Sequence, residues 1–196
     1  MESKMKNKLN KNYLIIGTVV LVLIIGYYFV QDSFITKIKE VSEEELQQRF
    51  NLLSNSRTNF CAGPEIINVS NTDRLQGSCC SAMDLHRYEE QVIGLQKYSN
   101  IDKIPSDPYD IPKSLAEELL NYQKTIKLNP EQQLIYDRAV KLSHEGGPCC
   151  CKCWRWYAFE GLAKYLIIEY GFNSEQIAEI WDLEDGCGGT GHLHDT

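Results

Sequence analysis

Four of the eight cysteines in this 196-residue chain lie within five positions, in the segment Cys149-Cys150-Cys151-Lys152-Cys153. A thiolate is both a nucleophile and a metal ligand, and soft thiolates select Cu(I), Zn(II) and similar ions. The segment also contains a Cys-x-x-Cys pair, Cys150 and Cys153, which could carry thiol–disulfide exchange. It precedes a strongly helical segment, and thiolates are favoured near the N-terminus of a helix. The cluster therefore predicts a thiol site, for a metal or for redox chemistry.

Disulfide bonds are the structural alternative for these cysteines. Eight is an even number, and the four clustered cysteines could pair with Cys61, Cys79, Cys80 and Cys187. Three consecutive cysteines are nevertheless awkward to pair, because a disulfide requires a specific separation and direction of the two Cβ atoms. Metal binding, thiol–disulfide exchange and a disulfide-stapled interaction domain all stay open at this stage.

A second candidate set begins at two adjacent cysteines, where we predict a helix over residues 79–98. At about 100° per residue, an imidazole, a thioether, a thiol and a carboxylate would fall on one narrow stripe of that helix. Copper sites use such donors. The simpler alternative is that Met83 packs and that His86 and Glu90 are surface side chains. The predicted metal ligands of this set are Cys79, Cys80, Met83 and His86.

The C-terminal segment supplies a third set of candidate ligands. We predict a helix over 153–170, which is apolar on nearly all sides and should therefore be buried. Asn173 or Ser174 should cap a further helix over 175–185. The two helices would be about 27 and about 16 Å long. If they form an antiparallel hairpin, the second ends about 11 Å short of the cluster, a distance that three or four extended residues span. We therefore expect Cys187, and with it His192, to return to the Cys149–Cys153 site. The alternative for His192 is a disordered terminus.

The elements that must position these residues are predicted to be helices. Ser42 and Glu45 form a capping box, and Asn129 followed by Pro130 is a typical helix start. Residues 101–112 contain three prolines and should be extended or turned. No strand pattern competes, so we predict an all-α domain of about five helices within residues 42–196. Besides those named above, the predicted helices cover residues 42–53, 113–126 and 129–144.

An uncharged run at residues 14–30 predicts a membrane anchor. It would reach about 26 Å as a helix, near the thickness of a hydrocarbon core, and four lysines precede it. The positive-inside rule places the N-terminus in the cytoplasm and the rest outside. A cleaved signal peptide is the alternative. The predicted parts are a cytoplasmic basic tail (1–12), a single transmembrane helix (13–30), a stalk (31–41) and a Cys-rich extracytoplasmic domain (42–196).

Charge excludes one class of partner for that domain. The chain carries a net charge of −7, and residues 1–12 contribute +3 from four lysines and one glutamate, so the remainder carries −10. Nucleic-acid binding depends on cationic side chains that neutralise phosphates. An acidic domain argues against nucleic acid and is compatible with cations.

A segment of about 40 residues resembles two extracytoplasmic protein groups. Cys150-x-x-Cys153, a helix, and then Tyr170-Gly171-Phe172-Asn173-Ser174-Glu175-Gln176-Ile177 are similar to the thiol-bearing helical hairpin of cytochrome c haem-lyase thioreductase subunits. Pro148-Cys149-Cys150-Cys151-Lys152-Cys153 loosely resembles the motif of PCYCGC proteins. The resemblance implies extracytoplasmic thiols on a helical hairpin that serve a metal or haem pathway, with Cys150 and Cys153 as the matching pair.

These patterns together predict a membrane-anchored, extracytoplasmic soft-metal binder that acts in sequestration or delivery. Copper is the expected ion and zinc the alternative, and a protein of a metal pathway is an expected partner. A thiol–disulfide oxidoreductase centred on Cys150 and Cys153 remains the enzyme alternative. The predicted metal ligands are Cys149, Cys150, Cys151, Cys153, Cys187, Cys79, Cys80, Met83, His86 and His192.

Overall fold

The computed structural model describes residues 42–69 and 71–189. The chain divides into units of residues 1–40 and 41–196, and the structure describes the second unit alone. The predicted basic tail (1–12), transmembrane helix (13–30) and stalk (31–41) lie outside the described residues. Within the described ranges, no helix has both the length and the apolar character needed to cross a membrane.

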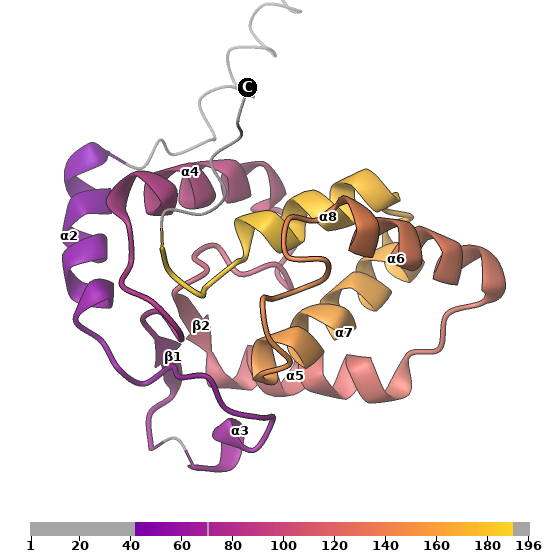
Figure 1. Cartoon of the computed structure of the whole chain (residues 1–196), viewed down its shortest axis with the longest axis horizontal. Helices are drawn as coiled ribbons and strands as arrows, with labels where there is room; N and C mark the ends of the chain where they lie inside the picture. The colour runs from indigo at the N-terminus through magenta and orange to yellow at the C-terminus, as the bar shows by residue number, and fades with distance from the viewer. Residues whose placement is uncertain (1–41, 70, 190–196) are drawn as a thin grey trace, which may run out of the picture. The chain divides into compact units, whose positions relative to one another are not determined.

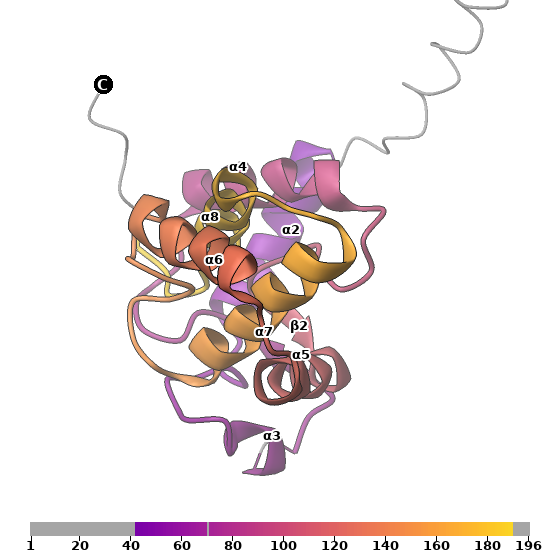
Figure 2. The ribbon, with the colours of Figure 1, turned by 90° about the vertical axis from the view of Figure 1, so that its right-hand side faces the viewer.

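The described part of the chain is mostly helical, as predicted, and it also contains one small sheet (Figures 1 and 2). A short 3-10 helix, η1 (Gln96–Tyr98), extends the third of its helices. The helices are α2 (Glu43–Ser54), α3 (Ile66–Val69), α4 (Leu85–Leu95), α5 (Lys113–Thr125), α6 (Pro130–Leu142), α7 (Trp154–Glu169) and α8 (Ser174–Leu183).

The two-stranded sheet corrects the all-α prediction. Strands β1 (Arg74–Gln76) and β2 (Asp110–Pro112) pair antiparallel, with Leu75 opposite Ile111. These two side chains are buried, and Arg74 forms an ion pair with Asp110 at 2.5 Å. Three residues are too few to show the alternation by which a strand is recognised in a sequence. The pairing comes from tertiary contacts between segments that are far apart in the chain.

Capping side chains fix where three of the helices begin. Ser42 accepts a hydrogen bond from the Glu45 amide at the start of α2, as predicted. Asn129 and Asn173 each form a complete capping box, at α6 and α8 respectively. A cap satisfies backbone N–H groups that the first helical turn leaves without partners. The predicted starts of α2 and α6 are therefore confirmed, and α8 begins one residue before the predicted start, with Asn173 rather than Ser174 as its cap.

The helix predicted over residues 79–98 begins six residues later than expected. Helix α4 starts at Leu85, and Asp84 caps it by accepting a hydrogen bond from the Arg87 amide. The preceding residues form a loop because their amides bond to another segment: Cys79 N donates to Gly186 O at 3.1 Å, and Ser81 N donates to Cys187 O at 2.8 Å. Cys79 and Met83 therefore do not share a helical stripe with His86.

Helix α7 forms the centre of the main apolar core and is buried on nearly all sides, as its sequence predicts. It packs against α5, and the two helices lie side by side in both views (Figures 1 and 2). Gly161 makes this close approach possible, because a Cβ there would overlap the carbonyl oxygen of Leu119 and lie 2.7 Å from the Gln123 nitrogen. Helix α8 packs mainly on α6 and also contacts α4.

Candidate metal centre

The eight cysteines gather at one place from four separate segments. Cys61 lies between α2 and α3, and Cys79 and Cys80 lie between β1 and α4. The Cys149–Cys153 segment joins α6 to α7, and Cys187 follows α8. Every cysteine belongs to at least one group of three whose sulfur atoms lie within 4.8 Å of one another, and these groups share members. The result is one continuous cluster of eight thiols, which are all free.

Four of these thiols form an inner group, which we define as Cys79, Cys149, Cys153 and Cys187. Within it, the Sγ atom of Cys149 lies 3.7 Å from that of Cys153 and 3.4 Å from that of Cys187. The sulfurs of Cys79 and Cys187 are 3.8 Å apart. Cys149, Cys153 and Cys187 are buried and Cys79 is half-buried. A tetrahedral ion with metal–sulfur bonds of about 2.3 Å holds its sulfurs about 3.8 Å apart, close to these three of the six distances in the group.

The other four thiols form an outer group: Cys61, Cys80, Cys150 and Cys151. Cys61, Cys80 and Cys150 are exposed, and Cys151 is half-buried. The sulfurs of Cys61 and Cys151 are 3.1 Å apart, and that of Cys150 lies 3.0 Å from Cys187. The outer group therefore contacts the inner group, through Cys150 and Cys187, and is reached by solvent.

Backbone geometry brings the C-terminal cysteine into the cluster. The segment after α8 runs beside the loop that precedes α4, and Cys80 N and Ser81 N both donate to Cys187 O (Figure 1). Gly188 has a φ of +81°, and a Cβ at this position would overlap the carbonyl oxygen of Ser81. Only glycine accommodates both the left-handed conformation and the close contact. The predicted return of Cys187 to the Cys149–Cys153 segment is thus confirmed.

The loop that carries Cys61 is tied to the start of α7. Trp154 N donates to Ala62 O at 2.7 Å, and the Trp154 indole N–H donates to the side chain of Asn59 at 3.0 Å. Both Trp154 and Asn59 are buried. Because Trp154 follows Cys153 directly, these bonds hold the Cys61 segment beside the Cys149–Cys153 segment.

The inner group favours a thiolate at Cys149. Hydrogen bonding with the thiols of Cys153, Cys187 and Cys79 lowers the pKa of Cys149 far below the ordinary value. The same bonding raises the pKa of the Cys79 thiol, which acts as a donor. In the outer group, burial raises the pKa of Cys150 to about 11. A metal binds the thiolate form of cysteine, which a lowered pKa favours.

A buried cation lies behind the inner group. Arg155 is 1% exposed, and its guanidinium lies 5.0 Å from the Phe159 ring and donates to the carbonyl of Glu184. Burial acts to lower the pKa of Arg155, but the nearby anionic forms of Cys79, Cys149 and Glu184 raise it above its ordinary value. A fixed positive charge near the sulfurs would compensate for the negative charge of thiolates if a metal bound there.

Glu184 is the buried acid next to this arginine. It is 1% exposed, and neither of its carboxylate oxygens accepts a hydrogen bond within the described part of the chain. Burial raises its pKa well above the ordinary value, against the opposing effect of Arg155. Arg155 Nη1 is likewise buried without a hydrogen-bond partner among the described residues. Arg155 and Glu184 are thus two buried, oppositely charged side chains near the thiols.

The structure brings together seven of the ten predicted ligands and separates two others from them. Met83 packs instead against the second apolar cluster, which contains Tyr88 and Val92, and its backbone pairs with Gly189. His86 lies on the exposed surface of α4, 3.2 Å from Glu90. The predicted stripe of donors on one helix face is wrong, because helix α4 begins at Leu85, after Cys79 and Met83. His192 lies outside the described residues.

Three residues of the site were not predicted. The sequence predicts Cys61 only as a disulfide partner, and nothing in its spacing distinguishes it as a metal ligand. Arg155 stands two residues after Cys153 in a helix that is otherwise mainly apolar, which was a usable signal. Glu184 gave no signal, because its burial depends on how α8 packs.

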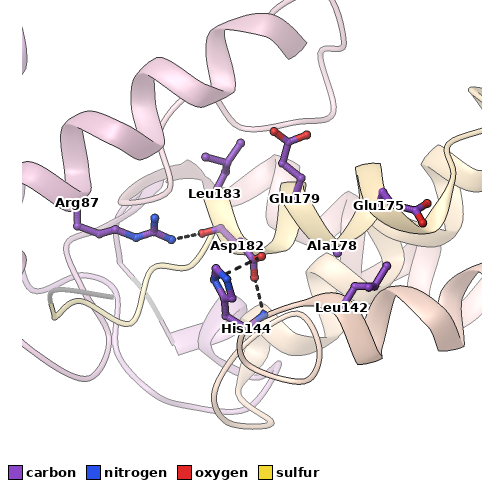
Figure 3. Close-up of a pocket in the computed structure, with 8 residues that line it drawn as sticks. All are labelled: Arg87, Leu142, His144, Glu175, Ala178, Glu179, Asp182 and Leu183. Atoms are coloured by element: carbon purple, nitrogen blue, oxygen red, sulfur yellow. Dashed lines mark hydrogen bonds and ion pairs between the residues drawn. The ribbon is translucent and has the colours of Figure 1, made fainter. Parts of the chain in front are cut away.

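A separate groove lies between α4, α8 and the end of α6 (Figure 3). It measures about 450 Å³ and is lined by polar side chains that include Arg87, His144 and Asp182. His144 Nδ1 lies 3.5 Å from a carboxylate oxygen of Asp182, and Arg87 donates to the Asp182 carbonyl at 2.6 Å. His144 therefore faces Asp182 and belongs to none of the cysteine groups.

Comparisons with family models, curated proteins and solved structures give no match for this chain. The resemblance of the Cys150–Ile177 segment to two extracytoplasmic groups therefore stays a prediction. What the described residues establish is an all-sulfur donor set that could hold a metal ion. Donors of this kind suit soft ions such as Cu(I) and Zn(II) rather than Mg²⁺ or Ca²⁺.

Proposed function

We propose that this protein binds soft metal ions, with Cu(I) as its principal ion, for sequestration or delivery. The proposal includes the predicted setting: a domain held outside the cell membrane by the helix at residues 13–30, exchanging metal with a protein of the same pathway. One observation carries the metal-binding proposal, namely that four chain segments place eight sulfur atoms in one continuous cluster. Zinc is the alternative ion.

Sulfur neighbours favour a metal centre over disulfides. The Cys187 sulfur has three sulfur neighbours, at 3.0 Å (Cys150), 3.4 Å (Cys149) and 3.8 Å (Cys79). A disulfide joins a sulfur to only one partner, at about 2.05 Å. A metal ion instead gathers three or four sulfurs around one point. The environment of Cys187 supports the second arrangement.

The number of thiols favours copper. One tetrahedral Zn(II) ion uses four ligands, and eight are present in the cluster. Three of them are buried near a fixed cation, two are half-buried and three are exposed. More thiols than one ion requires support the binding of several ions, and soft thiolates rank Cu(I) among their preferred partners.

Thiol–disulfide exchange receives less support from the same geometry. The pair that the sequence offers is Cys150 and Cys153, but Cys150 contacts Cys187 and Cys153 contacts Cys149. The exposed member, Cys150, has its pKa raised to about 11, so its nucleophilic thiolate is scarce at neutral pH. An efficient exchange centre requires a lowered pKa at its accessible thiol.

Metal titration of the full chain tests the proposal. The reduced protein, purified in detergent without oxygen, is titrated with Cu(I) and separately with Zn(II), and bound ions are counted by native mass spectrometry. We expect more than one Cu(I) per chain. The variant Cys149→Ser/Cys153→Ser should bind fewer ions, whereas His86→Asn, which changes an exposed side chain away from the cysteine groups, should bind as many as the original chain. A reduced, folded chain that binds neither ion would show the proposal to be wrong.

A further inference from the structure

The exposed thiols of the cluster are arranged differently from the buried ones. Cys61, Cys80 and Cys151 form a group of three whose sulfurs all lie within 4.8 Å of one another. Two of them are exposed and the third is half-buried. We propose that this trio is an exchange site, which takes up Cu(I) from thiol ligands in solution and releases it to them, while the inner group retains its ion. This inference rests on the proposed function.

Three sulfurs at this spacing suit a three-coordinate ion. A planar centre with metal–sulfur bonds of about 2.3 Å places its sulfurs about 4.0 Å apart. The sulfurs of the trio lie within 4.8 Å of one another, and the Cys61–Cys151 pair, at 3.1 Å, would have to open by about 0.9 Å around the ion. Such a centre leaves both faces of the plane without a ligand. Because the trio is at the surface, an incoming thiolate can reach the ion through an open face. An accessible position of this kind distinguishes sites that exchange ligands from closed structural sites.

The inner group has the opposite properties. Three of its four cysteines are buried, and three pairs of its sulfurs lie 3.4, 3.7 and 3.8 Å apart. The four cysteines come from three segments: the loop before α4, the loop before α7 and the segment after α8. Removal of an ion from this position requires those segments to separate. Release from the inner group should therefore be slower than release from the trio.

Two thiols of the trio connect the sites. Cys151 shares a group with Cys149 and Cys153, and Cys80 shares a group with Cys79 and Cys187. An ion bound at the trio thus has inner sulfurs as neighbours on both sides. The inner group can be filled through the trio without direct contact between its sulfurs and a partner.

The exchange step requires no change of oxidation state. A thiolate from solution forms a new sulfur–copper bond, and the bond between copper and the Cys61 sulfur breaks. The released Cys61 thiolate takes up the proton that the incoming thiol lost. Copper remains Cu(I) throughout, so the step needs neither an oxidant nor a reductant.

Chelator challenge of the loaded full chain tests the inference. The reduced protein in detergent is filled with Cu(I) and mixed with excess bicinchoninate, whose copper complex is coloured, and release is followed over time. We expect a fast and a slow phase, with rates that differ at least tenfold. Cys61→Ser/Cys80→Ser/Cys151→Ser should lose the fast phase and keep the slow one. Cys149→Ser/Cys153→Ser should lose the slow phase.

The possible results separate this inference from the proposed function. One phase in the original chain, or an equal loss of both phases in the two variants, would overturn the exchange site while leaving metal binding intact. Absence of bound Cu(I) in the original chain would overturn both. If circular dichroism shows the triple variant to be unfolded, the single variant Cys61→Ser replaces it. Its fast phase should fall at least tenfold in rate or amplitude, and an unchanged fast phase would contradict the inference.

Discussion

The α5–α7 packing and the cysteine cluster are held together in different ways. Between the two helices, apolar side chains meet around Gly161, and burial of their surface supplies the stability. In the cluster, loops from four parts of the chain present thiols to one another beside a buried arginine. Thiol–thiol contacts alone contribute little, and like charges would repel once thiolates form. We infer that the helical region is stable without metal. The stability of the loops that carry the cysteines should depend on a bound metal ion.

Removal of two inner ligands should produce the largest effect. With free ion at about 1,000 times its Kd, binding stabilises a protein by about 4 kcal/mol, so Cys149→Ser/Cys153→Ser should lose about that much metal-dependent stability. Urea unfolding with and without Zn(II) or Cu(I) measures this difference. Cys61→Ser, in the outer group, serves as the control and should retain most of the stabilisation. Equal stabilisation of the double variant and the original chain would contradict the proposed inner site.

Overpacking in the helical region should have the next largest effect. Gly161→Ala places a methyl group against the Leu119 carbonyl oxygen, and we expect about 3 kcal/mol of destabilisation. Since α5 and α7 do not depend on the ion, this loss should be the same with and without metal in urea unfolding. Glu117→Ala, on the exposed side of α5, should change stability by less than about 0.5 kcal/mol. A loss at Gly161 that disappears on metal binding would mean that the two regions are not independent.

Arg155 links the two regions, and its charge should affect metal affinity. In a Glu184→Gln background, which avoids leaving a buried acid without its cation, Arg155→Met should weaken metal binding about tenfold, as do other changes to groups that support metal ligands. Arg155→Lys retains the positive charge and should recover part of the affinity. Competition with a coloured chelator gives the affinities. Identical affinities in the methionine and lysine variants would show that the charge has no role.

Glu184 should give the smallest effect, seen in the pH dependence of stability. Burial raises its pKa in the folded state, so the native protein holds this proton more tightly than the unfolded chain. The stability that protonated Glu184 contributes is fully present at pH values below the pKa of this group in the unfolded chain, near 4.5. It is lost as the pH rises through the pKa of Glu184 in the folded protein. Glu184→Gln should remove this loss and be about 1 kcal/mol more stable than the original chain at neutral pH.

The control for this prediction is the same comparison at pH 4, measured by thermal unfolding without metal. There the acid is protonated in both states, so the difference between Glu184→Gln and the original chain should nearly vanish. A stability difference that stays constant from pH 4 to pH 8 would contradict the assigned shift.

Helix starts and helix burial could be predicted from the sequence where local chemistry determines the structure. The caps at Ser42, Asn129 and Asn173 act on backbone groups within three residues, so the starts of α2, α6 and α8 could be predicted. The continuous apolar character of α7 likewise predicted a buried helix. The position of Cys187 followed from helix lengths. Each of these inferences used information held within a short stretch of the chain.

The predicted structure was wrong where hydrogen bonds to a distant segment compete with the local preference for a helix. Residues 79–83 have a helical pattern, but their amides bond to the segment after α8, so the predicted Cys79–His86 stripe does not form. The β1–β2 pairing, the place of Cys61 beside Cys151, and the burial of Glu184 also arise from contacts between remote segments. Such contacts leave no periodic signal in the sequence.

Native mass spectrometry of the full chain, combined with thiol counting, tests the metal centre most directly. The protein is isolated without added metal or reductant, its mass is measured, and its cysteines are alkylated before and after removal of metal. We predict soft-metal ions bound to the chain, with all eight cysteines becoming reactive once the metal is removed. A chain that carries no metal and whose eight cysteines form four disulfides would contradict the account.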